Sequence, residues 1–328
     1  MDVVTRSAVD WLLESREPAV RYLTGRDLIG VDDLVERGRI LDGPWVRALL
    51  AGQQEDGGFG VHPYSKWTGA HWRLVSLVEL GIPAGHPGAR RAADTVLDWL
   101  NSDGHRGRIA SVDGLTRRCA SQEGNALAVA SRLGLAGDPR ARLLGESLIG
   151  WQWPDGGWNC DERGAMASVH ETLAPTWGLH EYSLATGDEA AAGAARRAAE
   201  VFLARRLFRS RRTGEPVRKE WMAFHYPPYW HYDVLQGLLI LTRLGLARDP
   251  RAADALDHVE RRRLKDGRWR PGAYWWSSPG SGRRQQDVVD WGRSGPNEMI
   301  TLNALRVLKA AGRVAPPHPH GQRDTGNG

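Results

Sequence analysis

The sequence has few cysteines and no long hydrophobic run. Only Cys119 and Cys160 occur among 328 residues, so a disulfide framework is excluded and a reducing compartment is expected. The longest apolar run, 235–241, is interrupted by Gln236 and Gly237. The N-terminal segment also lacks the apolar stretch of a secretory signal. These absences predict a cytoplasmic protein without a membrane span.

Charge of one sign is not in large excess either. The formal net charge is +5, and the densest basic run, 205–219, holds seven basic residues and one acid. No nucleic-acid-binding motif accompanies this run. Nucleic acid is therefore not expected as a partner.

What the chain has instead is glycine and tryptophan, 39 and 15 residues respectively. Several glycines end apolar segments that read as helices, where a left-handed residue can close the last helical turn. Six such stops follow one another at spacings of 51, 53, 53, 58 and 67 residues: Gly30, Gly81, Gly134, Gly187, Gly245 and Gly312. The near-constant spacing indicates a repeated helical unit.

A second kind of segment lies between these stops. Segments that start near Pro87, Pro139 and Pro250 carry their charges on one face, as an amphipathic outer helix does. We therefore expect an all-α fold, an (α/α)6 toroid with an inner and an outer ring. The first helix should pack beside the last inner helix and close the ring. One domain would cover residues 1–314, followed by a disordered tail at 315–328.

Aspartate-glycine turns follow the predicted outer helices. QQEDGGFG (53–60) and QWPDGGWN (152–159) are the fullest copies, and NSDG (101–104) and KDGRW (265–269) are degenerate ones. Glycine permits the positive backbone angles of such turns, while the aspartate and glutamine can bond nearby backbone groups. We interpret these turns as structural staples.

The pattern Q-x-x-D-G-G-[WF] on paired helices resembles the terpenoid cyclase and protein prenyltransferase superfamily, which includes squalene-hopene cyclases and prenyltransferase β subunits. The resemblance implies a toroid with a central apolar cavity and a site at the N-terminal ends of the inner helices. The D-x-D-D acid motif of class II cyclases is absent, and Asp287-Val-Val-Asp290 has a different spacing. The Asp-rich diphosphate motif of class I enzymes is absent too.

Long loops enter the predicted inner helices, and they carry the candidate functional residues. Aromatic faces stabilise carbocations, and His and carboxylates can handle protons. The predicted catalytic residues are Glu123, His170, Glu171, His225, His231, Asp233 and Glu298. The predicted substrate-binding residues are Trp67, His71, Trp177, Arg211, Arg212, Tyr226, Tyr229, Trp230, Tyr232 and Trp291, with the two arginines assigned to an anionic head group.

No cofactor is predicted firmly. The resembling β subunits bind zinc through Asp, Cys and His, and the nearest set here is Cys160, Asp161 and His170, in which the Cys-Asp pair is adjacent and reversed. A divalent metal, zinc or magnesium, is the only cofactor considered. The expected partner is a small hydrophobic or anionic-headed ligand, with a second protein subunit as a further option.

Three other functions remain open at this point. The toroid could bind a ligand or protein partner without catalysis. It could be a carbohydrate-active helical barrel that uses paired carboxylates such as Glu123, Glu171, Asp233 and Glu298. Cys119 and Gln122 also have the spacing of a thioester, although the intervening residues differ from those of thioester domains.

Overall fold

The computed structural model describes residues 2–314, and these residues are predominantly helical. The predicted all-α class is confirmed, apart from one short hairpin of two antiparallel strands. The predicted disordered tail, 315–328, lies outside the described residues. None of the helices in 2–314 is long and apolar enough to cross a bilayer.

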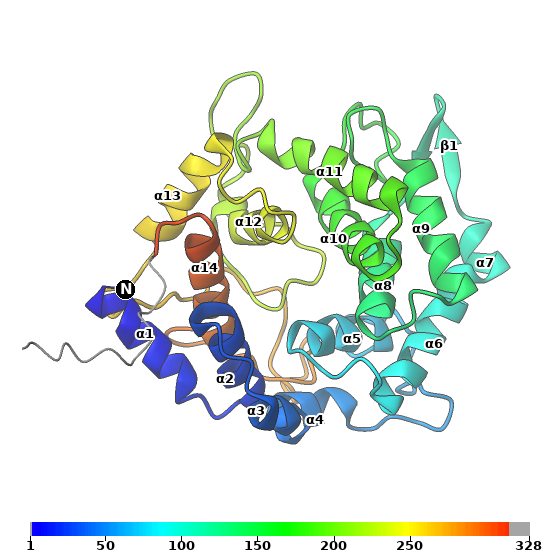
Figure 1. The fold of residues 1–328 in the computed structure, drawn as a ribbon. Coiled ribbons are helices and arrows are strands. Elements are labelled where there is room, and N and C mark those ends of the chain that lie inside the picture. The colour runs from blue at the N-terminus through cyan, green and yellow to red at the C-terminus, as the bar shows by residue number, and fades with distance from the viewer. Residues whose placement is uncertain (1, 315–328) are drawn as a thin grey trace, which may run out of the picture.

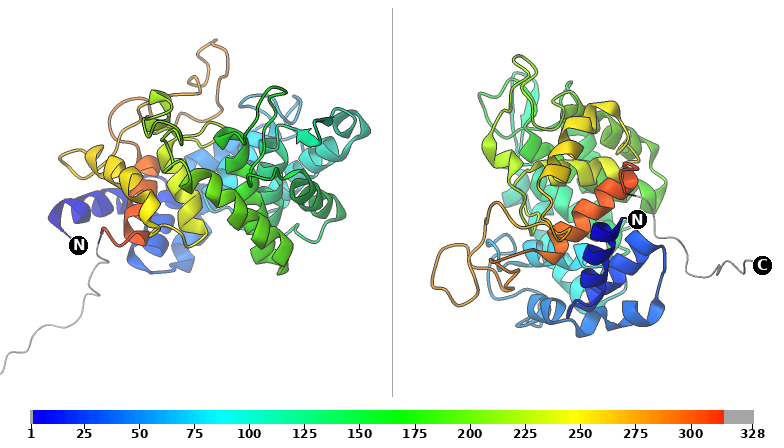
Figure 2. Two further views of the ribbon diagram at one scale, coloured as in Figure 1. Left: turned by 90° about the horizontal axis from the view of Figure 1, so that it is seen from above. Right: turned by 90° about the vertical axis from the view of Figure 1, so that its left-hand side faces the viewer.

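The helices alternate along the chain between central and peripheral positions (Figures 1 and 2). The central ones are α2 (Pro18–Thr24, continued by a π-helical turn at Gly25–Ile29), α5 (Ala70–Glu79), α8 (Ser121–Arg132), α10 (Val169–Thr186), α12 (Val234–Arg243) and α14 (Glu298–Ala310). The peripheral ones are α1 (Val3–Leu13), α3 (Leu34–Arg39), α4 (Pro44–Leu50), α6 (Pro87–Asn101), α9 (Pro139–Trp151), α11 (Glu189–Leu203) and α13 (Ala253–Arg261).

Short elements occupy the connections. They are α7 (Asp103–Arg106), strands β1 (Ala110–Val112) and β2 (Leu115–Arg117), and the 3-10 turns Ile40–Asp42, Lys219–Met222 and Pro250–Ala252. The hairpin pairs Ala110 with Arg117 and precedes α8 directly.

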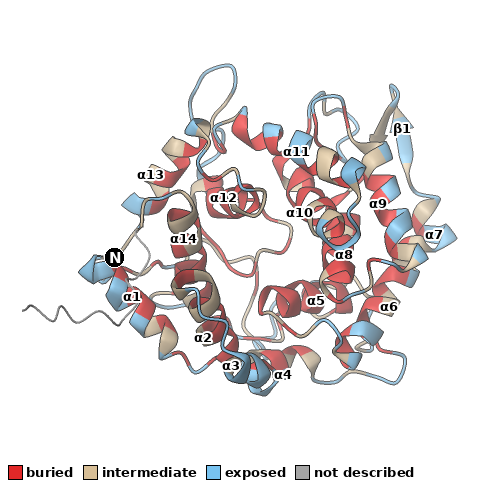
Figure 3. Ribbon diagram, in the orientation of Figure 1, coloured by how far each residue is buried: buried red, intermediate tan, exposed pale blue. Residues whose placement is uncertain are grey.

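Neighbouring central helices contact one another in the order α5, α8, α10, α12, α14 and α2, and most central helices also contact a peripheral helix next to them in the chain. Helix α1 contacts both α14 and α2, so the first helix of the described residues packs beside the last one, as expected. Arg263, just beyond α13, donates a hydrogen bond to Thr5 of α1. The central helices are the most buried elements (Figure 3).

All six predicted glycine stops are confirmed. Gly30, Gly81, Gly134, Gly187, Gly245 and Gly312 each have a φ between 74° and 87°. Four of the preceding segments, α5, α8, α12 and α14, are 10 to 13 residues long, and the glycine ends each of them in the left-handed conformation that other residues adopt at a cost.

The stapling role of the aspartate-glycine turns is also confirmed. The Gln152 side chain donates to the carbonyl of Gly156 in its own turn and to that of Ala194 in α11. Gln53 does the same with Gly57 and with Gly88 in α6. Each glutamine therefore ties its own turn to the next peripheral helix.

Candidate functional site

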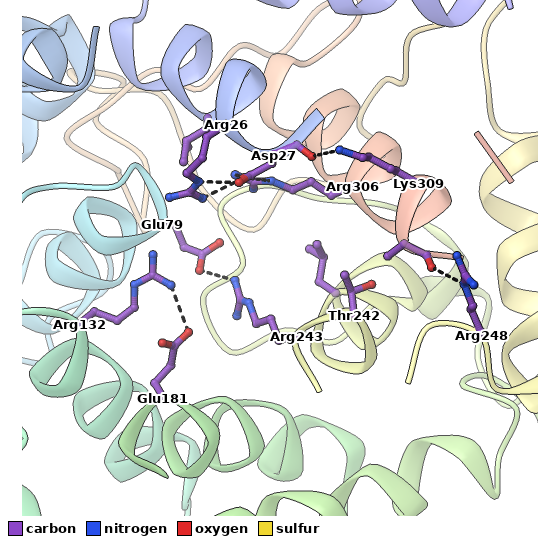
Figure 4. A pocket seen from close by; sticks show the side chains of 13 residues that line it. Arg26, Asp27, Glu79, Arg132, Glu181, Thr242, Arg243, Arg248, Arg306 and Lys309 are labelled. Atoms are coloured by element: carbon purple, nitrogen blue, oxygen red, sulfur yellow. Dashed lines mark hydrogen bonds and ion pairs between the residues drawn. The ribbon is translucent and has the colours of Figure 1, made fainter. Parts of the chain in front are cut away.

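A cavity of about 460 Å³ lies at the C-terminal ends of the central helices (Figure 4). All six central helices contribute to its wall. The lining residues are Leu23, Arg26, Asp27, Glu79, Arg132, Glu181, Leu239, Thr242, Arg243, Arg248, Arg306, Lys309 and Ala310. Its volume falls within the range of small-molecule sites.

The wall contains six cationic side chains and three carboxylates. Every carboxylate is already paired with an arginine (Figure 4): Asp27 with Arg26 and Arg306 at 2.5 Å each, Glu79 with Arg243 at 2.6 Å, and Glu181 with Arg132 at 3.1 Å. Because the cations outnumber the carboxylates, the cavity carries an excess of positive charge.

The carboxylates in this wall are held in their ionised form. Burial opposes ionisation of Asp27, but Arg306 and Arg26 outweigh it and lower the pKa of its carboxyl. Burial likewise opposes ionisation of Glu181, yet Arg132 and Arg243 lower its pKa below the usual value. Neither group is therefore tuned to donate a proton near neutral pH.

The ends of helices carry partial negative charge, and cations near them have a structural use. Lys309 donates to the carbonyls of Asp27 and Leu28, and Arg248 donates to that of Ala310. The other four cations of the wall pair with carboxylates and make no such bond. Helix capping thus accounts for two of the six cations, and the other four face three carboxylates, which leaves an excess of one positive charge.

A smaller and more apolar chamber adjoins this cavity. Its volume is only about 20 Å³, and it shares Glu79, Leu239 and Arg243 with the larger cavity. Its other lining residues are Asn125, Leu173, Ala174, Trp177, Pro228, Tyr229, Gln236 and Ile240. Of the aromatic residues predicted to line a central cavity, Trp177 and Tyr229 line this chamber and none lines the larger cavity. The Trp177 indole donates to Glu181 at 2.9 Å, and the Arg243 guanidinium lies 4.8 Å from its ring centroid.

At the opposite ends of the central helices, the segment 225–233 is packed into the interior. Asp233 caps α12 by accepting from the Gln236 amide at 2.9 Å, and its other oxygen accepts from the His225 amide at 2.9 Å. His225 Nδ1 also lies 2.6 Å from Asp233. Both side chains are buried, at 2% and 0% exposure, so this pair holds the segment against α12.

Stacked rings fill the same region. His231 stacks on Trp230 and on Trp275, with centroids 3.8 and 3.9 Å apart. Burial lowers the pKa of His231 to about 2, so the ring is neutral and packs as an aromatic. Trp67 stacks on Tyr229 at 3.9 Å.

Asp287 binds two aromatic side chains in this region. It accepts hydrogen bonds from the Tyr229 hydroxyl and from the Trp291 indole, the latter at 2.9 Å. Tyr226 packs edge-on against Trp291, and the Tyr232 hydroxyl donates to the Leu207 carbonyl at 2.7 Å. Four of the predicted binding residues are thus engaged in packing at this end.

The remaining predicted residues lie apart from the cavity wall. His71 is buried among α5, α6 and α8, where burial lowers its pKa to about 3. Glu123 is buried with Arg118, at 2.7 Å, and with His105 at 3.0 Å. Glu298 is partly buried at the start of α14, and Arg211 and Arg212 are exposed on the loop after α11.

The residues considered for a metal are only partly brought together. Cys160 lies with Cys119 and Glu171 in a group whose ligand atoms are all within 4.8 Å of one another. Asp161 and His170 do not belong to this group. The His170 ring instead accepts from the Tyr232 amide at 3.0 Å.

Sequence reasoning missed the charged wall of the cavity, although a signal was present. Glu79, Arg132 and Arg243 each stand two residues before a helix-ending glycine. A charge recurring at one position of apolar, inward-facing helices indicates that their ends converge on something polar. The resemblance implied a cavity at the opposite, N-terminal ends of these helices, whereas the 460 Å³ cavity lies at their C-terminal ends.

No family model matches the chain, and no curated protein matches it in sequence. Among solved structures, a protein from Actinoplanes aligns at 18% identity over 94% of this chain and 98% of its own, with a TM-score of 0.45. The type II terpene cyclase MstE from Scytonema aligns at 15% identity over 95% of this chain and 98% of its own, also with a TM-score of 0.45. Similarity at this level identifies no activity.

Proposed function

We propose that the chain forms a single (α/α)6 toroid that binds an isoprenoid-type ligand with an anionic head group in its central cavity. The observation that carries the proposal is the excess of cations over carboxylates around the 460 Å³ cavity. The excess favours a negatively charged ligand, because guanidinium groups with unused N–H donors bind phosphates and carboxylates strongly.

The hydrophobic part of the ligand is assigned to the apolar surface next to these charges. Leu23 and Leu239 contribute to the cavity wall, and Leu239 continues into the chamber beside Trp177. The chamber itself has room for about one water. A hydrocarbon chain would therefore lie in the larger cavity, with its end directed at Trp177. The isoprenoid class comes from the resemblance of the turns, and the anionic head from the charges of the wall.

A glycosidase function has less support at this cavity. Such enzymes need one carboxylic acid with a raised pKa beside a second carboxylate. The pKa values of Asp27 and Glu181 are lowered, and Glu79 is engaged with Arg243. We therefore place ligand binding ahead of acid-catalysed hydrolysis.

Calorimetric titration with inorganic diphosphate, geranyl diphosphate and farnesyl diphosphate tests the proposal. The esters should bind at least about tenfold more tightly than the inorganic anion, since burial of their methylene groups adds affinity. Arg132→Met and Arg26→Met should each weaken ester binding about 10- to 100-fold, because each removes a charge-assisted hydrogen bond to the head group.

The exposed pair Arg211 and Arg212 provides the matched control. The double variant Arg211→Gln/Arg212→Gln should leave the affinity within about twofold, because exposed charges are screened at physiological salt. A selective loss in this variant would move the head group to the loop, where the sequence first placed it. Absence of binding by all three compounds would contradict the proposal.

A further inference from the structure

The only two cysteines of the chain, 41 positions apart in sequence, meet in the folded structure. Cys119 lies just before α8, Cys160 follows the turn after α9, and both are free thiols. Glu171, in the first turn of α10, joins them. The two sulfur atoms and a Glu171 oxygen all lie within 4.8 Å of one another. None of these residues lines the central cavity.

Backbone pairing brings the two cysteines together. Arg117 and Asn159 form a parallel bridge, and the Arg118 amide donates to the Asn159 carbonyl at 3.1 Å. Cys160 directly follows Asn159, and Cys119 directly follows Arg118. The Arg117 guanidinium also donates to the carbonyls of Asp161 and Gly164, at 3.0 and 2.5 Å. The loop that carries Cys160 is therefore fixed against the segment that carries Cys119.

Close packing of α8 on α10 supplies the carboxylate. A Cβ atom added at Gly124 would lie 2.3 Å from the Pro175 nitrogen, and one added at Gly178 would lie 2.3 Å from the Gly124 carbonyl. The two backbones therefore touch at glycines. This contact sets Glu171 against the start of α8, where its Oε2 accepts from the Ser121 amide at 3.1 Å.

That hydrogen bond leaves the second oxygen for the thiols. Glu171 Oε1 lies 3.8 Å from Cys160 Sγ. A backbone donor that fixes one carboxylate oxygen while the other faces the site is the arrangement found around metal-binding carboxylates. Glu171 is buried, whereas Cys160 is exposed, so the group is open to solvent on one side.

We propose that Cys119, Cys160 and Glu171 bind a zinc ion. Two thiolates and a carboxylate suit zinc, and tetrahedral zinc with bonds of about 2.0–2.3 Å places its ligand atoms roughly 3.3–3.8 Å apart. The observed group needs to contract by only about 1 Å to reach that spacing. Three protein ligands leave the fourth position for an exchangeable water, on the side where Cys160 is exposed.

The experiment is a titration of the reduced, metal-free, untagged full chain with cobalt(II) under anaerobic conditions, followed by displacement with zinc. One cobalt should bind per chain and give a thiolate-to-cobalt charge-transfer band, which zinc then abolishes. Since the chain has no other cysteines, any such band must come from these two. Cys119→Ser and Cys160→Ser should each show a charge-transfer band of about half the wild-type intensity per bound cobalt. Glu171→Gln should weaken the binding of cobalt.

Asp161→Asn is the matched control. Asp161 is an exposed carboxylate beside Cys160 but lies outside the group, so this variant should bind cobalt as the wild type does. As a measurement that needs no variant, zinc should protect both thiols of the wild type from a thiol reagent.

Three outcomes would overturn the proposal. They are the absence of the charge-transfer band, a band whose intensity is unchanged in both serine variants, and thiols that react equally fast with and without zinc. Rapid oxidation of the reduced protein to a Cys119–Cys160 disulfide that zinc does not prevent would also count against it.

Discussion

Arg243 and Glu79 form an ion pair of 2.6 Å whose two side chains line both the basic cavity and the apolar chamber. The Glu79 side chain is 6% exposed and that of Arg243 is 24% exposed. The pair joins the C-terminal ends of α5 and α12. It therefore lies where the two cavities meet and connects helices that are far apart in sequence.

Loss of this pair should destabilise the fold. Arg243→Met would leave the buried Glu79 carboxylate without its partner, and we expect a loss of about 2–4 kcal/mol in the free energy of unfolding. Glu79→Gln in the same background should restore part of that loss, since no buried charge then remains. Urea denaturation of the wild type, both single variants and the double variant measures the coupling. Additive effects would show that the two residues act independently.

Two glycine-to-alanine changes should have opposite effects on stability. One glycine lies in the contact between α8 and α10, and the other lies in α9, outside that contact. Gly124→Ala should destabilise the protein by more than about 2 kcal/mol, because the new Cβ would collide with the backbone of Pro175. Gly150→Ala, within α9, meets no atom within 4 Å, so it should stabilise by about 0.5–1 kcal/mol. Thermal unfolding of both variants tests the contrast. An equally mild effect at Gly124 would show that the helices are not in backbone contact.

Glu17 should make stability fall as the pH rises. Its carboxyl accepts from the Trp45 amide, and burial raises its pKa from 4.5 to about 7. Between these values the folded state holds a proton that the unfolded state has released, so the free energy of unfolding decreases with increasing pH. Relative to Glu17→Gln, the wild type should lose about 3 kcal/mol from pH 4.5 to 7.

Denaturation midpoints of both proteins across this pH range give the Glu17 contribution as a difference. Parallel curves would show that the carboxyl ionises in the folded protein as it does in the unfolded one.

His231 should act in the opposite direction. Burial lowers its pKa to about 2, so on acidification below pH 6.5 the unfolded state takes up a proton that the folded state refuses. Stability is therefore lost as the pH falls, by about 2 kcal/mol between pH 6.5 and 5. His231→Phe preserves an aromatic ring between Trp230 and Trp275 and should remove this loss. The measurement is the free energy of unfolding of both proteins at pH 5 and at pH 7, and the wild type alone should lose stability at the lower pH.

Local patterns in the sequence were sufficient to predict the helices and their ends. Gly134 and Gly245 end α8 and α12 with positive φ, and Pro139 begins α9. Asp56 accepts from the Gly58 amide within its own turn, as expected of a turn aspartate. Each feature depends on residues close in sequence, so that propensity and turn chemistry decide it.

The location of the cavity could not be predicted in the same way. The segment around Tyr229 fills the space at one end of the central helices because it stacks on Trp67, and the Trp67 indole donates to the carbonyl of Trp275, 208 positions away. Whether such a loop fills the interior or leaves it open depends on packing among distant segments. The proximity of Cys119 and Cys160 depends on contacts of Arg117 and Arg118 with the segment 159–164, which the periodicity of the sequence does not reveal either.

The contacts of α14 with α1 and α2 have a consequence for how the chain reaches its native state. Asp27, near the beginning, bonds to Arg306, 279 positions later, and Lys309 donates to the carbonyl of the same aspartate. During synthesis, the earliest helices must wait for almost the whole polypeptide before their partners exist. Until α14 has been made, the apolar faces of α1 and α2 remain partly uncovered, which favours aggregation of the nascent chain.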